Sequence, residues 1–256
     1  MPAEAPLPHL TEPDPTDRAA LLAGLRARIA RLDSGLAGFG TGRASLSLSP
    51  ELDAHLPWNG LPLAGLHEVL SAEPGAAIGF SALLLARAQA ALPGRSVLWI
   101  APEPDAYPPG LASIGLSAAS LILVRASRPA DALWAAEEGL RCPAIGAALL
   151  FGAAPDLTAA RRLQLAAETG GGIGLLLRPD DESPGPTAAL TRWRLSARPS
   201  PEAGPHHLGE PGWEIALLRA RGGRPGAWVG EWDAARGELR TLAPAQAAPA
   251  AKRRRA

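Results

Sequence analysis

The segment from Ser71 to Ala82, "SAEPGAAIGFSA", has residue types that bind phosphate groups in other proteins. It follows the strand-like run "LHEVL" and precedes the helix-like run "LLLARAQAAL". Glycines let a backbone approach phosphate closely, and the N-terminus of a helix attracts anions. The residues that such a site would use are Ser71, Pro74, Gly75, Gly79 and Ser81.

The same segment lacks the cation that nucleotide hydrolysis requires. A phosphate loop places Lys on the β- and γ-phosphates and Ser or Thr on Mg²⁺, in the order Gly-Lys-Ser/Thr. No lysine occurs near this segment, and no register within it restores that pair. We therefore expect no hydrolysis and no required cofactor. Weak binding of ATP through the helix dipole stays open as an alternative.

The elements around this turn predict an α/β core. Strand-like runs alternate with helix-like runs, the strands at 65–71, 95–103, 120–127, 144–153 and 172–179 and the helices at 79–94, 129–142 and 157–170. This alternation indicates a mostly parallel sheet with helices on both faces. Later strands without intervening helices, at 190–197, 212–221, 227–233 and 237–243, are expected to form a C-terminal antiparallel extension.

The remaining segments differ from the core in composition and periodicity. A Pro-rich polar start predicts disorder, and a following run with apolar residues at helical spacing predicts an amphipathic helix. The expected parts are a disordered tail (1–15), an amphipathic helix (16–35), a linker (36–56), the core (57–243) and a basic disordered tail (244–256).

Composition argues against several classes of protein. The net charge is zero, which argues against electrostatic attraction of the whole protein to nucleic acid. The only cysteine, Cys142, rules out an intrachain disulfide and is expected to be a small buried residue. The histidines are scattered, so no metal site is expected. No signal peptide or membrane-spanning run is recognisable, so we expect a cytoplasmic protein without membrane contact.

The order of these elements resembles the RecA ATPase core. The similarity begins at "GLPLAGLHEVLSAEPG" and continues through the alternating elements and the later strands to about residue 243. It implies a RecA-like three-layer core in which the turn after Ser71 corresponds to the phosphate loop. It also implies a metal-binding carboxylate at the end of "GAALLF", where Phe151 or Gly152 stands instead.

Other positions that the RecA resemblance singles out are degenerate as well. Glu103 matches the glutamate that activates water in RecA, but without a phosphate clamp it is a vestigial residue, expected to be a solvated loop carboxylate. Asp156 is expected to cap the helix that begins near Leu157. Arg178 stands where RecA carries a polar amide and is expected to be an exposed arginine at a strand end. The resemblance therefore implies a P-loop NTPase fold without catalytic residues.

Within that superfamily, two segments resemble the ImuA family. They are "LPWNGLPLAGLHEV" and "WEIALLRARGGRPGAWVGEWD". This resemblance implies a role in SOS-induced mutagenic translesion DNA synthesis. The partners that it implies are ImuB, a homologue of Y-family polymerases, and an error-prone C-family polymerase, with RecA as a further candidate. We expect a non-catalytic adaptor whose contact with DNA is mainly indirect.

Arginines and tryptophans gather late in the chain. Together they are typical of protein interfaces and also of sites that stack single-stranded nucleic acid. We expect most of the tryptophans to be core residues, and the turn "GGRPG" to expose its arginine. The candidate partner-binding residues are Arg219, Arg221, Arg224 and Trp228.

Three alternatives to an adaptor stay open. One is a weak ATP-binding or ATPase switch in the same pathway. Another is an inhibitor of cell division like SulA, which the long C-terminal segment disfavours. The third is an accessory protein that binds single-stranded DNA directly through its late arginines and tryptophans.

Overall fold

A computed structural model describes residues 44–181, 184–200, 209–234 and 236–244. The expected tails and the amphipathic helix at 16–35 lie outside the described residues. The strands are β1 (Ser45–Leu46), β2 (Leu61–Pro62), β3 (Gly65–Ser71), β4 (Ser96–Ala101), β5 (Leu121–Arg125), β6 (Ile145–Phe151), β7 (Ile173–Pro179), β8 (Thr191–Arg198), β9 (Gly212–Ala220), β10 (Gly226–Asp233) and β11 (Glu238–Pro244). The helices are α2 (Pro50–Asp53), α3 (Pro74–Ala91), α4 (Pro108–Ser113), the 3₁₀-helix η1 (Ala118–Ser120), α5 (Pro129–Arg141) and α6 (Leu157–Gly170).

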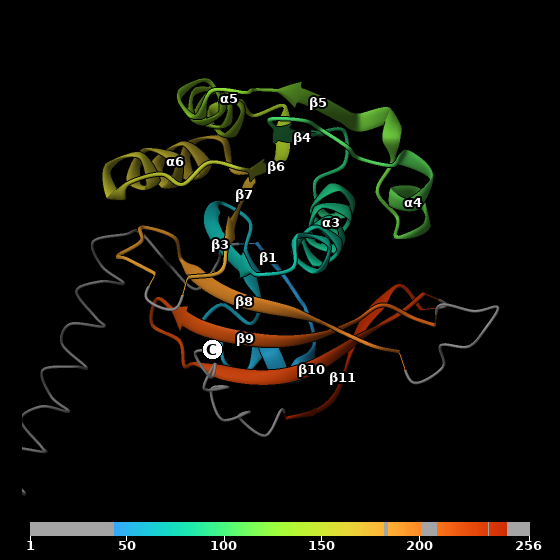
Figure 1. Cartoon of the computed structure of the whole chain (residues 1–256). Helices are drawn as coiled ribbons and strands as arrows, with labels where there is room; N and C mark the ends of the chain where they lie inside the picture. The colour runs from blue at the N-terminus through green and yellow to red at the C-terminus, as the bar shows by residue number, and fades with distance from the viewer. Residues whose placement is uncertain (1–43, 182–183, 201–208, 235, 245–256) are drawn as a thin grey trace, which may run out of the picture. The chain divides into compact units, whose positions relative to one another are not determined.

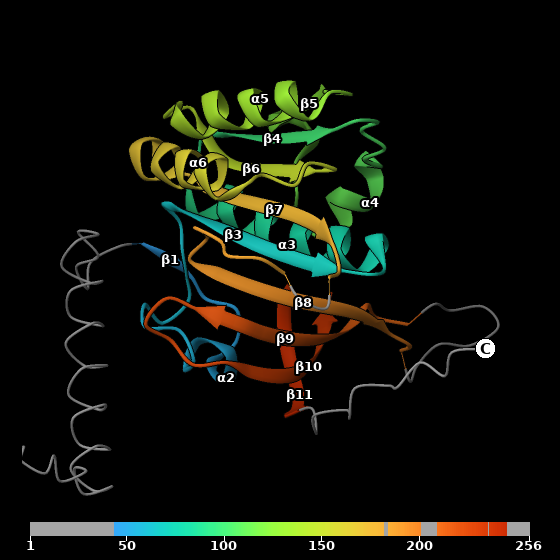
Figure 2. The same cartoon turned by 60° about the vertical axis from the view of Figure 1, so that its left-hand side comes forward.

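Nine of these strands form one sheet in the order β11-β10-β9-β8-β3-β7-β6-β4-β5. Neighbouring strands are parallel from β8 to β5 and antiparallel from β8 to β11. Figure 2 shows this ladder of strands, with α6 in front of the sheet and α3 behind it. The expected α/β core with a mostly parallel sheet and a C-terminal antiparallel extension is confirmed.

The strand at 190–197, expected in the antiparallel extension, is β8, which is antiparallel to β9 and pairs in parallel with β3. It is therefore the joint between the two parts of the sheet. Residues 44–56, expected to belong to a linker, contain β1 and α2, because Leu46, Leu48 and Leu52 are buried in the core.

Helices cover both faces of the parallel part, as Figure 1 shows. On one face α3 and α4 enclose a cluster of apolar side chains that includes Phe80 and Trp99. On the other face α5 and α6 enclose a second cluster, with Leu66 and Ile100 at its sheet side. The central strands β3, β6 and β7 are almost wholly buried, which is why they are nearly continuous in apolar residues.

Candidate functional site

The connection between β3 and α3 is a tight turn of two residues. Strand β3 ends at Ser71 and helix α3 begins at Pro74, so only Ala72 and Glu73 lie between them. The Ser71 hydroxyl closes the turn by accepting the Glu73 N–H at 3.0 Å and donating to the Glu73 carbonyl at 2.9 Å. A phosphate loop of about eight residues wraps its N–H groups around the phosphates. Here no such loop separates the strand from the helix.

The candidate residues beyond this turn lie inside helix α3. Gly75 and Gly79 stand in its first two turns. A Cβ added at Gly75 would meet nothing within 4 Å, and one at Gly79 would make an ordinary contact of 3.5 Å with Trp213. Ser81 is fully buried, and its hydroxyl has no hydrogen-bond partner. The structure therefore does not bring these three residues together around a ligand.

The N-terminal end of α3 is in contact with the antiparallel part of the sheet. The Glu73 carboxylate accepts the Ala197 N–H of β8 at 3.0 Å. The Trp213 indole of β9 donates to the Ala76 carbonyl at 3.0 Å and packs edge-on against Phe80. Side chains of the protein itself thus occupy the surroundings of the helix terminus.

Glu103 lies at the surface, as expected of a solvated carboxylate. Its carboxylate is 3.1 Å from the Arg125 guanidinium, and the two side chains are 75% and 67% exposed. Asp156 caps α6 by accepting the Ala159 N–H at 2.7 Å, which confirms the role expected for it. Phe151 ends β6 with no carboxylate at its position.

The late arginines expected to bind a partner lie around the β9–β10 hairpin. The Arg219 guanidinium donates to the Ala189 carbonyl at 3.0 Å, and the Arg221 N–H donates to the Leu190 carbonyl at 2.9 Å. The Arg224 N–H donates to the His55 carbonyl at 3.0 Å. The side chains of Arg219 and Arg224 are exposed, and that of Arg221 is half-buried.

Packing explains much of the motif "RARGGRPGAW". A Cβ added at Gly223 would lie 2.5 Å from the His55 carbonyl oxygen, so the hairpin can approach the residues after α2 only because Gly stands there. The Trp228 ring lies edge-on to His55, with the ring centroids 4.8 Å apart. Trp228 is 5% exposed, so its expected role as a partner contact is wrong: it is a core residue.

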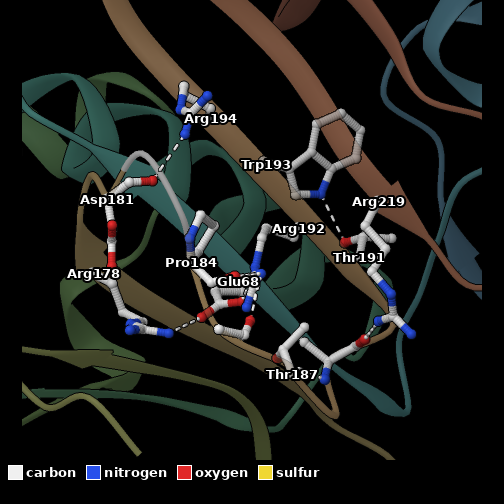
Figure 3. A network of polar contacts seen from close by, with 12 residues as sticks. Glu68, Arg178, Asp181, Pro184, Thr187, Thr191, Arg192, Trp193, Arg194 and Arg219 are labelled. Atoms are coloured by element: carbon white, nitrogen blue, oxygen red, sulfur yellow. Dashed lines mark hydrogen bonds and ion pairs between the residues drawn. The ribbon is translucent and has the colours of Figure 1, made fainter.

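A network of buried charges lies where β3, β7 and β8 run side by side, as Figure 3 shows. Glu68 is 1% exposed, and its carboxylate oxygens lie 2.6 Å from Arg178 Nη1 and 2.5 Å from Arg192 Nε. Arg192 Nη1 also donates to the carbonyls of Pro184 and Gly185. Arg178 is therefore not the exposed strand-end arginine that we expected. The network fastens the β7–β8 connection to the sheet.

A neutral hydrogen-bond chain lies on the opposite face of β3. The His67 Nε2–H donates to the Pro62 carbonyl at 3.0 Å, so the neutral ring accepts the Thr191 hydroxyl at Nδ1, 2.8 Å away. The Trp193 indole in turn donates to Thr191 Oγ1 at 2.7 Å. Burial lowers the pKa of His67 to about 4, which keeps the ring neutral near pH 7.

These residues were not among the predicted site residues, although the sequence carries a signal for them. Strands buried on both faces are expected to be apolar, so His67 and Glu68 in "LHEVL" and Arg192 in "LTRWRL" need buried partners. We name these residues, with Thr191, the β3–β8 seam. Every one of its four side chains is at least nine-tenths buried, so the seam is structural.

Three further expectations concern a metal site, a membrane-spanning helix and Cys142, in the part of the chain that the structure describes. No group of three or more His, Cys, Asp or Glu residues there is placed to hold a metal ion. No helix there is long and apolar enough to cross a membrane. Cys142 was expected to be buried, but it is exposed, because it follows the last residue of α5 at the surface.

Comparison with known proteins identifies relatives. No protein-family model matches the chain. Protein ImuA from two strains of Caulobacter vibrioides is 41% identical over 194 residues, which cover 70% of this chain and 80% of that protein. The chain therefore belongs to the ImuA family.

Proposed function

We propose that this protein is a non-catalytic adaptor in SOS-induced mutagenic translesion DNA synthesis. Membership of the ImuA family supports a role in SOS mutagenesis. The observation that carries the non-catalytic part is the two-residue connection between β3 and α3. In this proposal the chain retains the sheet of a RecA-like core, but the connection between β3 and α3 is too short to surround the phosphates of a nucleotide.

The partners proposed are proteins: an ImuB-like homologue of Y-family polymerases, and RecA or an error-prone C-family polymerase. The exposed arginines of the β9–β10 hairpin, Arg219 and Arg224, are candidate contacts. Trp134 of α5 adds a second candidate. It is 66% exposed and borders a hollow of about 290 Å³ between α5 and α6. Tryptophan and arginine are the residue types that contribute most at protein interfaces.

Direct binding of single-stranded DNA is the less favoured reading. Stacking of bases needs exposed aromatic faces, whereas the four late tryptophans are at most 6% exposed, these being Trp193, Trp213, Trp228 and Trp232. Arg192 and Arg194 are already paired with Glu68 and Asp180. Contact with DNA is therefore proposed to be mainly indirect.

Calorimetry and turnover assays test the non-catalytic part. Titration of the purified chain with ATP, with and without Mg²⁺, is expected to give no Mg²⁺-dependent binding. ATP turnover is expected to equal that of the Glu103→Gln variant. Mg²⁺-dependent turnover that Glu103→Gln abolishes would refute the proposal, and would establish an ATPase switch instead.

A binding assay with the ImuB-like protein of the same organism tests the adaptor part. Arg224 and Trp134 are both exposed side chains. Whichever of the two lies in the interface, its substitution (Arg224→Glu or Trp134→Ala) is expected to weaken binding of the ImuB-like protein about ten-fold or more. Arg198→Glu, an equally exposed change at the end of β8, is the matched control and is expected to bind normally. Absence of any complex between the unaltered proteins would refute an adaptor for this partner.

A further inference from the structure

The two edges of the nine-stranded sheet differ in chemistry. Edge strand β11 carries Glu238, Arg240 and Thr241 among its residues. Edge strand β5, at the other end, reads Leu-Ile-Leu-Val-Arg and has one charge, at its last residue. Charged side chains on an edge strand oppose pairing with another chain, and an apolar edge lacks that protection.

Strand β5 is open on both of its faces. Ile122 pairs in register with Leu98 on the face of α5 and α6, and Leu123 pairs with Trp99 on the face of α3. Leu98 and Trp99 are buried, but Ile122 and Leu123 are each 44% exposed. Within the described part of the chain, β5 therefore has no strand neighbour on its outer edge, and a half-exposed aliphatic side chain lies on each of its two faces.

We infer that β5 pairs with β5 of a second copy of this chain, antiparallel about a two-fold axis. With the axis at Leu123, that residue lies opposite its own copy, and Ile122 lies opposite Val124 of the second copy. These pairs are apolar on both faces, as cross-strand stabilisation requires. Arg125 lies opposite Leu121, so no like charges meet across the axis. The strand is complementary to itself, which is what an isologous interface needs.

This pairing goes beyond the adaptor function. Two copies joined at β5 would form one continuous sheet, with β11 of each copy at its two ends and the β9–β10 hairpin next to β11. The β9–β10 hairpins of the two copies would then each bind a separate partner molecule. Because the β9–β10 hairpin is far from β5 in the strand order, the dimer interface can be tested separately from the candidate contacts Arg219 and Arg224.

Sedimentation equilibrium of the full-length chain tests the inference. A concentration-dependent dimer is expected. Leu123→Lys should weaken it about ten-fold or more, because it removes an apolar pair and places two ammonium groups opposite each other. Leu242→Lys is the matched control, since Leu242 is 42% exposed on the other edge strand, and it should leave the dimer unchanged. Thermal unfolding of each variant verifies that it is folded.

A cross-link gives a second measurement. Leu123→Cys in a Cys142→Ser background should form a disulfide between copies on oxidation, because directly opposite antiparallel residues have the Cα separation that a disulfide needs. A chain that is monomeric at every attainable concentration would overturn the inference. So would a dimer that a folded Leu123→Lys variant leaves intact. If the chain is monomeric and Leu123→Lys abolishes binding of the ImuB-like protein, the edge belongs to that partner instead.

Discussion

The β3–β8 seam and the β3–α3 turn both involve strand β3, yet they differ in what they contain. The turn, from Ser71 to Pro74, has the residue types of a ligand site, but the hydroxyl of Ser71 closes it with two hydrogen bonds to the Glu73 backbone. The seam has buried charge and a neutral buried histidine, and it joins the parallel and antiparallel parts of the sheet. The seam therefore places buried polar groups within the sheet itself, whereas the polar groups of the turn lie at or beyond the end of β3.

The ionic side of the seam gives the largest expected effect. Glu68→Ala leaves Arg178 and Arg192 without their buried counter-charge and should lower the free energy of unfolding by about 3–5 kcal/mol. Denaturant unfolding of the variant measures this. The double variant Glu68→Leu/Arg192→Leu should recover part of the loss, because removing both charges is less costly than removing one. A loss below about 1 kcal/mol for Glu68→Ala would show that the network is not structural.

The neutral side of the seam should make stability depend on pH. The pKa of His67 is about 4 in the folded chain and about 6.5 when unfolded. The unfolded chain therefore binds more protons, so stability is lost as the pH falls from about 6.5 towards 4, by at most about 3 kcal/mol. Denaturant unfolding at several pH values should show a smaller slope in that window for His67→Gln than for the unaltered chain. Equal slopes would contradict the assignment.

The hydroxyl of Thr191 should matter less than the charge of Glu68. Thr191→Val keeps the shape but leaves His67 Nδ1 and the Trp193 indole without their buried partner, at a cost of about 1–3 kcal/mol. Thr169→Val, at an exposed position of α6, is the control and should change the free energy of unfolding by less than about 0.5 kcal/mol. Equal losses for the two variants would argue against the hydrogen-bond chain.

The first two turns of helix α3, which follow the β3–α3 turn, should give the smallest effect, and one of opposite sign. Gly79→Ala should raise the free energy of unfolding by up to about 1 kcal/mol, because alanine favours a helix interior and its Cβ fits at 3.5 Å from Trp213. Gly75→Ala should be neutral or slightly stabilising. Gly230→Ala should instead destabilise the chain, since its Cβ would lie 2.7 Å from Ile215. Destabilisation by Gly79→Ala would mean that glycine serves a purpose there beyond the helix.

Sequence patterns identified the elements of the core but not all of their pairings. The apolar runs of β3, β6 and β7 and the helix between β6 and β7 were predictable, because burial on both faces leaves a continuous local signal. The parallel pairing of β8 with β3 was not predictable. Strand β8 begins a series of strands without intervening helices, and such a series indicates antiparallel pairing. Burial was the expectation for most of the tryptophans, and Trp228 follows it; its listing as a candidate partner contact was wrong because tryptophan is common both in cores and in interfaces.

The sequence by itself determined the alternation of strands and helices, the absence of a phosphate-loop lysine and membership of the ImuA family. These properties are written in local runs of residues or in direct identity with a relative. Only the tertiary structure decided that Glu68 meets Arg178 and Arg192, that His67 meets Thr191, and that β5 ends the sheet uncovered. The residues that meet in these contacts lie 110 or 124 positions apart in the chain, and a local pattern cannot pair residues over that separation.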